Sequence, residues 1–183
     1  MPKTAIFLAD GFEEIEALTV VDLLRRAGIE ISMVSIMGRK NVKGSHNIAV
    51  EADELFEDAN LDSCDMLILP GGMPGTSNLF ACEPLKGKIK EFDAEGKMLA
   101  AICAAPTVYG RMGLLNGKKA SCYPGCEGDL AGADVRMSEV TVDGHFITSR
   151  GMGTAIPFGL AIIEHFQGKK AAEEMASRIV YKV

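Results

Sequence analysis

The sequence predicts a doubly wound α/β domain with a mostly parallel central sheet. Short apolar runs alternate with segments of helical periodicity along its 183 residues, a pattern typical of βαβ units. The first unit comprises residues 4–9 (TAIFLA), an amphipathic segment over 13–27 and a second apolar run over 29–36. A strand, a helix and a strand in so short a stretch normally form a parallel, right-handed unit. We expect one domain over residues 1–183, with no repeat or linker.

The remaining elements continue this alternation. Residues 38–52 predict a small antiparallel hairpin, and residues 65–69 (DMLIL) predict a buried strand. A helix is expected from Glu83 to Glu95, since Gly96 suits the left-handed position that follows a helix. The apolar run 98–102 predicts the next strand, and short strands are expected over 119–122 and 140–148, the latter folded at residues 143–144. A Gly-rich loop over 149–154 precedes a helix that ends near residue 166, and a last amphipathic helix is expected over 170–180.

Composition excludes several classes of protein. The chain has 19 Lys+Arg against 25 Asp+Glu, a net charge of −6, and no basic stripe with interleaved aromatics, so no nucleic-acid partner is expected. No apolar run approaches the ~20 residues of a membrane span, and the first residues lack a signal-peptide pattern. We therefore expect a cytoplasmic protein without a membrane partner. Five cysteines are an odd number, which favours reduced thiols, and no second Cys/His pair joins Cys122 and Cys126 to form a metal site.

The most informative stretch is KMLAAICAAPT, residues 97–107. Cys103 directly follows the apolar run, and a proline three residues later suits the first turn of a helix. A thiol at such a strand-to-helix corner lies beside unpaired N–H groups and the positive end of the helix dipole, which predicts a lowered pKa and a reactive thiolate. Ala101 and Ala105 provide the small residues that a nucleophile elbow requires. The alternative is a buried structural cysteine.

Two other loops follow predicted strands and carry polar groups. Gly71 and Gly72 permit close backbone approach, so their amides, with that of Ala104, could form an oxyanion hole. Glu13 and Glu16 are three residues apart on one helical face, and a desolvated carboxyl there would have a raised pKa and could move a proton. The alternatives are simple turn glycines and a solvated helix start. Ligands of doubly wound sheets bind beyond the carboxyl ends of the strands, so we expect these loops to converge.

The segments GFEEIEA (11–17), LPGGMPG (69–75), AAICAAPT (100–107) and SRGMGTA (149–155) together resemble the ThiJ/PfpI family. The likeness is greatest to the branch of the Parkinson-disease protein, described as a protein deglycase, and its bacterial relatives. It implies a flavodoxin-like, class I glutamine amidotransferase-like sandwich that forms a homodimer and uses no cofactor. By motif, Cys103 would be an elbow nucleophile that is easily oxidised to a sulfinic acid. Glu16 would be a protonated carboxyl bonded to its sulfur, and Gly72 and Ala104 would supply amides.

The resemblance also implies that Arg26 and His46 lie near the dimer interface and the pocket mouth, with His46 in place of the usual arginine. Two departures concern the chemistry. Protease-like members have a His after the nucleophile, where this chain has Ala104, so peptidase activity is not expected. Tyr123 stands where the Parkinson-disease protein has a His, and Tyr cannot act as a neutral-pH base in the same way. Glu16 would then carry most of the proton transfer.

The resemblance implies a cysteine-dependent stress-response enzyme that acts on reactive dicarbonyls (methylglyoxal, glyoxal) or on glycated protein and thiol adducts. The alternative is a non-enzymatic oxidative-stress sensor or chaperone that works through oxidation of Cys103. Amidotransferase-like chemistry is disfavoured, because no obvious His completes a triad. The sequence leaves open whether Cys122 or Cys126 reacts with an oxidised Cys103.

Overall fold

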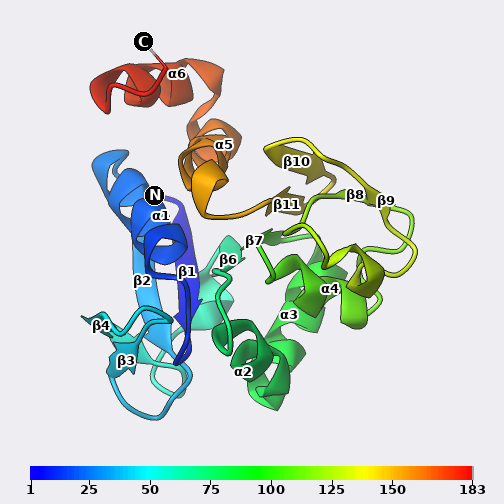
Figure 1. Cartoon of the computed structure of the whole chain (residues 1–183). Coiled ribbons are helices and arrows are strands. Elements are labelled where there is room, and N and C mark those ends of the chain that lie inside the picture. Colours follow the sequence, from blue (N-terminus) through cyan, green and yellow to red (C-terminus); the bar gives the residue numbers. More distant parts are fainter. Residues whose placement is uncertain (183) are drawn as a thin grey trace.

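A seven-stranded sheet forms the centre of the computed structural model, which describes residues 1–182 (Figure 1). Its strands lie in the order β10-β11-β7-β6-β1-β2-β5, and every pair is parallel except β10 and β11. The strands are β1 (Lys3–Leu8), β2 (Glu30–Ser35), β5 (Glu54–Leu55), β6 (Met66–Leu69), β7 (Met98–Ile102), β10 (Val140–Asp143) and β11 (Phe146–Ser149). This arrangement confirms the predicted fold class.

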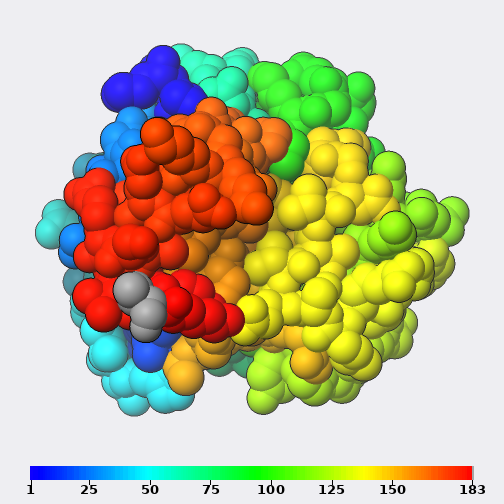
Figure 2. Space-filling view, turned by 90° about the horizontal axis from the view of Figure 1, so that it is seen from above, coloured from blue at the N-terminus to red at the C-terminus, as the bar shows by residue number. Residues whose placement is uncertain are grey.

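Helices cover both faces of the sheet, which explains why the central strands are apolar on both sides. Every residue of β6 and β7 is buried, as expected for parallel strands between two helical layers. One layer contains α1 (Glu14–Arg26), α5 (Ala155–Gln167) and α6 (Lys169–Arg178), and the other contains α2 (Gly75–Ala81), α3 (Glu83–Glu95) and α4 (Pro106–Arg111) (Figure 1). Figure 2 shows the segments of α5 (orange) and α6 (red) side by side at the surface of the molecule.

Two smaller sheets and several short turns lie outside the central sheet. β3 (Asn41–Lys43) and β4 (Ala49–Glu51) form the predicted antiparallel hairpin, while β8 (Lys119–Ala120) and β9 (Asp134–Val135) form a short parallel pair. Three 3-10 turns complete the chain: η1 (Leu61–Ser63), η2 (Glu127–Asp129) and η3 (Met152–Thr154). No helix in residues 1–182 is both long and apolar enough to cross a membrane.

Most predicted elements are present, and the differences have local causes. The long helices and central strands begin and end within about two residues of the predicted bounds. The sequence did not predict α2, β5 or β9. α2 begins with glycine and continues with Thr-Ser-Asn, residues of modest helix propensity that more often occupy turns. The predicted strand over 119–122 is shorter, because Ser121 and Cys122 leave the ladder after Ala120.

The fold places four loops together at one edge of the sheet. β1, β6, β7 and β11 are consecutive neighbours and all parallel, so their carboxyl ends meet. The segments that follow them are residues 9–13, 70–74, 103–105 and 150–154. The predicted convergence of the Glu-, Gly- and Cys-bearing loops is therefore confirmed, with the β11 loop beside them.

Candidate active site

Cys103 occupies a sharp corner between β7 and α4. Its φ is +65°, a left-handed conformation that costs a non-glycine residue on the order of 1–3 kcal/mol. Two backbone hydrogen bonds hold it there: the Cys103 N–H donates to Ser149 O at 3.0 Å, and the Tyr123 N–H donates to Cys103 O at 2.7 Å. The predicted elbow is therefore present, and neighbouring segments hold the strained residue on both sides.

The carboxyl of Glu16 lies against this thiol. Glu16 is in the first turn of α1 and is 1% exposed. The Gly71 N–H donates to its Oε2 at 2.9 Å, and the Cys103 thiol is its other hydrogen-bond partner. A Cβ at position 71 would lie 2.6 Å from both Glu16 Oε2 and Cys103 Cβ, so only glycine allows the pair to meet. Gly71 thus belongs to the site, but its amide serves Glu16 and not an oxyanion.

Burial determines the protonation of this pair. It raises the pKa of Glu16 from 4.5 to about 7, while the hydrogen bonds with Cys103 and Gly71 oppose the change. Burial, and next the negative charge of Glu16, also raise the pKa of the Cys103 thiol, and the amides of Ala104 and Gly72 only partly oppose this. The lowered thiol pKa predicted from the helix dipole is therefore wrong. Near pH 7 the sulfur keeps its proton, and Glu16 is poised to accept it.

The amides of Gly72 and Ala104 both donate toward the Cys103 sulfur. Gly72 has φ +91°, and a Cβ there would collide with the Glu13 backbone nitrogen. The conformation and the close approach both require glycine. These two donors lie where negative charge would develop on sulfur or on an oxygen bound next to it.

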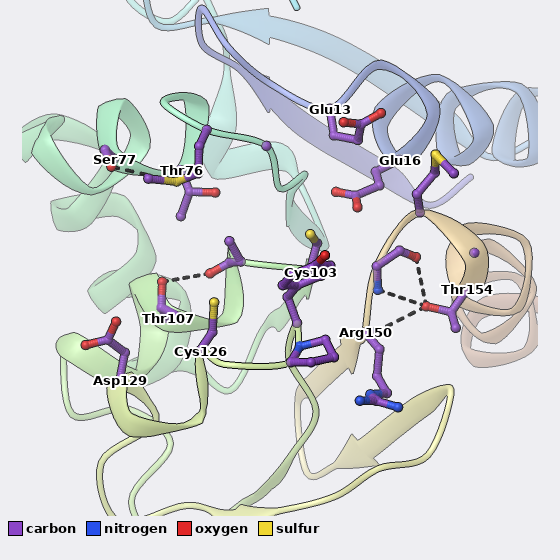
Figure 3. Close-up of a pocket in the computed structure, with 18 of the residues that line it drawn as sticks. Glu13, Glu16, Thr76, Ser77, Cys103, Thr107, Cys126, Asp129, Arg150 and Thr154 are labelled. Carbon is purple, nitrogen blue, oxygen red and sulfur yellow. Dashed lines mark hydrogen bonds between the residues drawn. The ribbon is translucent and has the colours of Figure 1, made fainter. Parts of the chain in front are cut away.

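A cavity of about 770 Å³ opens above the pair (Figure 3). Of the predicted site residues it is lined by Glu13, Glu16, Gly72, Cys103, Ala104 and Tyr123. Sequence reasoning missed several others: Thr76, Ser77, Thr107, Arg111, Cys126, Asp129 and Arg150. The signal for Arg150 was its place directly after a strand in the SRGMGTA segment. No sequence signal pointed to Thr76 and Ser77 on α2 or to Asp129 on η2, because these two elements were not predicted.

Arg26 and His46 do not line this cavity. Arg26 is in the last turn of α1, is exposed, and pairs with Asp22 at 2.6 Å. His46 lies in the β3–β4 turn, with its side chain 69% exposed and its Nδ1 3.1 Å from a Glu14 oxygen and 3.4 Å from a Glu13 oxygen. His46 thus contacts a cavity-lining residue, Glu13, without lining the cavity itself. Arg26 does neither.

Within the part of the chain that the structure describes, one cluster of side chains could hold a metal ion: Glu13, Glu14 and His46. One ligand atom from each lies within 4.8 Å of the others. The oxygens of Glu14 already accept hydrogen bonds from the backbone N–H of His46 at 2.8 Å and from Ile48 at 3.4 Å. These bonds fasten the β3–β4 hairpin to the start of α1. We therefore assign the cluster a structural role.

Tyr123 reaches the cavity from the loop after β8. It is 52% exposed, and a Cβ on Gly151 would lie 3.3 Å from its ring. The three histidines of the chain, His46, His145 and His165, all lie outside the cavity lining. Glu16 is therefore the group that contacts the sulfur and can take its proton.

The sheet order and the thiol–carboxyl pair at a strand-to-helix corner define a cysteine-centred α/β protein with a class I glutamine amidotransferase-like fold. The DJ-1/PfpI family model matches residues 2–165. The chain belongs to the DJ-1/PfpI family, which confirms the resemblance seen in its motifs.

Three similar proteins indicate the branch. The chain is 38% identical to Arabidopsis thaliana DJ-1 homolog B over 98% of its own length, but it spans only 42% of that protein. It is 34% identical to a deglycase of Pyrococcus abyssi, covering 82% of this chain and 91% of the relative. Superposition on the structure of oxidised Toxoplasma gondii DJ-1 covers 100% of both chains, with a TM-score of 0.96 and 34% sequence identity.

Proposed function

We propose that this chain is a cysteine-dependent enzyme that converts reactive dicarbonyls, such as methylglyoxal and glyoxal, or reverses their adducts on proteins and thiols. The observation that carries the proposal is the Cys103 thiol bonded to a carboxyl whose pKa is about 7, with two amides directed at the sulfur. A group that titrates near neutrality is suited to accept and return a proton. The likeness to a named deglycase supports the same class of chemistry.

The geometry supports a simple sequence of steps. The Cys103 sulfur attacks the aldehyde carbon, a C–S bond forms, and the thiol proton passes to Glu16. The amides of Gly72 and Ala104 hold the developing oxyanion of the hemithioacetal. Glu16 passes the thiol proton to the hemithioacetal oxygen and is then free to act as a base again. It removes the proton from the former aldehyde carbon and delivers it to the adjacent carbon, while the hydroxyl proton moves to the neighbouring oxygen, which gives a 2-hydroxy thioester. Hydrolysis releases the 2-hydroxy acid and the free thiol.

Methylglyoxal turnover tests the proposal. We expect Cys103→Ala to abolish turnover, and Glu16→Gln to lower kcat by about 100-fold or more, as expected when a general base is lost. Cys82→Ser is the matched control: this half-buried thiol precedes α3, outside the cavity, and its loss should leave the rate unchanged. Equal rates for wild type and Cys103→Ala would refute the proposal.

A second candidate is oxidative-stress sensing or a chaperone role through oxidation of Cys103. It is supported by the half-buried position of this thiol on the cavity, beside two backbone amides that can bond an oxidised sulfur. Cys64 and Cys122 are buried, and Cys126, the other thiol of this cavity, is half-buried. The test is mild peroxide treatment followed by mass spectrometry. Cys103 should gain sulfinic acid before any of the other four cysteines, and equal oxidation of all five would exclude a sensor role.

We further propose that the protein forms a homodimer. Large apolar side chains are exposed on and near the cavity-lining segments. Met152 lines the cavity and is 52% exposed, Ile15 lies between Glu13 and Glu16 in the sequence and is 50% exposed, and Ile48 is 54% exposed. The bond from the Ile48 N–H to Glu14 places the β3–β4 turn against the start of α1, next to Ile15. Sedimentation should show a dimer at micromolar concentration that the double variant Ile15→Glu, Ile48→Glu dissociates. A monomeric wild type would contradict this.

A further inference from the structure

Two of the side chains that line this cavity each contain a buried polar atom without a hydrogen-bond partner. Within residues 1–182 these atoms are Thr76 Oγ1 and Arg150 Nε. Thr76 is 4% exposed. Buried polar groups are nearly always hydrogen-bonded, because an unmade bond leaves their desolvation uncompensated. Two such side chains around one cavity indicate a lining suited to a polar ligand.

The backbone of Arg150 lies beside that of the reactive cysteine. It directly follows β11 as Cys103 directly follows β7, and the pairing of Ser149 with Ile102 places the two residues next to each other across the sheet. Adjacent strands are about 4.8 Å apart. The Arg150 backbone N–H donates a hydrogen bond to Thr154 Oγ1 at 3.2 Å. The Arg150 guanidinium forms no ion pair with any described carboxylate within 4.0 Å.

The charged side chains of the cavity are distributed unevenly, with negative charge on one side and positive charge on the other. Arg111 is paired with Asp129 at 2.6 Å, so this couple adds little net charge. Glu13 and Glu16 lie on the α1 side, and the Arg150 side chain extends away from them on the opposite side of Cys103 (Figure 3). A negatively charged group would be attracted toward Arg150 and repelled by Glu13. The cavity therefore favours one orientation of a substrate with one anionic end.

We propose that Arg150 binds a carboxylate of the substrate, and that the compounds acted on at Cys103 are oxo-aldehydes, or their thiol and amine adducts, that carry such a carboxylate. The guanidinium offers planar donors that match a carboxylate. Thr76 lines the cavity on the α2 side of Cys103 (Figure 3). The assignment of substrate class rests on the proposed function, whereas the binding of a carboxylate requires only a reactive Cys103.

The test compares alkylation of Cys103 by iodoacetate and by iodoacetamide, which differ mainly in charge. The ratio of the two rate constants, measured by mass spectrometry of the Cys103 peptide, cancels any general change in thiol reactivity. We expect this ratio to fall about tenfold in Arg150→Met, the effect of one lost charge-assisted contact, and to be largely restored in Arg150→Lys. Glu13→Gln should raise the ratio, because it removes the opposing charge.

Arg178→Met is the matched control. It also removes one positive charge, but from an exposed position at the end of α6, and it should leave the ratio unchanged. If Arg150→Met fails to fold, the wild-type ratio should still fall as salt rises from about 20 to about 500 mM, because salt screens the contact. A ratio within about twofold of wild type in Arg150→Met, or one insensitive to salt, would overturn the proposal. Because no turnover is measured, a failure of the dicarbonyl activity would be seen separately.

Discussion

Replacement of Glu16 by Gln should stabilise the protein at alkaline pH, although it removes the proposed catalytic base. The pKa of Glu16 rises from 4.5 to about 7 on folding, mainly because the carboxyl is buried. Between these two pH values the folded chain retains a proton that the unfolded chain has lost, so the free energy of unfolding falls as pH rises. A change of this size corresponds to about 3 kcal/mol once the pH exceeds 7.

Gln avoids this cost because it is neutral at every pH. Its amide oxygen can still accept the Gly71 N–H, and its NH₂ group can face the Cys103 sulfur. We expect Glu16→Gln to be more stable than wild type at pH 8 by up to about 3 kcal/mol, with the difference shrinking toward zero as pH falls to 4.5. Equilibrium urea unfolding at pH 5 and pH 8 measures it. A difference that does not change with pH would refute the burial argument.

Glu14→Gln is the matched control, since it alters another buried carboxyl two residues away. Burial tends to raise the pKa of Glu14, but its backbone hydrogen bonds and the contacts with His46 outweigh this and hold the pKa below 4.5. The stability it contributes is present above its unfolded pKa and is lost as pH falls through the folded value. Glu14→Gln should therefore destabilise the protein at pH 8, opposite in sign to Glu16→Gln.

Three further substitutions test the packing of the site. Gly71→Ala should lower thermal stability and the rate of Cys103 alkylation together, because the new Cβ would lie 2.6 Å from the pair; an unchanged alkylation rate would contradict this. Cys103→Gly should raise the free energy of unfolding by about 1 kcal/mol relative to Cys103→Ala, since glycine adopts a φ of +65° without strain; chemical denaturation measures it. Thr76→Val should be neutral or stabilising by about 1 kcal/mol, because its buried hydroxyl has no partner, and a clear loss of stability would show that the hydroxyl is satisfied within the protein.

The hydrophobic pattern was sufficient to predict the longer strands of the sheet and the longer helices, but not the two-residue edge strand β5. Residues 66–69 and 98–102 are apolar throughout because helices cover both faces of these strands. Gly96 ends α3 in the left-handed conformation that its position suggested, with φ +67°. In these segments local preference and tertiary packing agree, so a single sequence carries enough information.

The protonation state of the site could not be predicted in the same way. The position of Cys103 beside a helix start favours a thiolate, and the amides of Ala104 and Gly72 do act in that direction. The larger effect comes from burial and from Glu16, which is far away in sequence and is brought to the sulfur only by the glycine at position 71. Desolvation depends on the whole fold, so a local motif gives the location of the thiol but not its pKa.

The unfavourable features of this chain collect at one place. The positive φ of Cys103, the desolvated carboxyl of Glu16 and the unpartnered atoms of Thr76 and Arg150 all lie on or beside the same cavity. Each costs stability and is maintained by rigid surroundings: the Cys103 backbone by Ser149 and Tyr123, and Glu16 by Gly71. A carboxylate-bearing carbonyl compound would offset part of these costs, because it would pair with Arg150 and form a covalent bond with the Cys103 sulfur. The same features that cost the folded chain stability therefore favour binding of such a ligand.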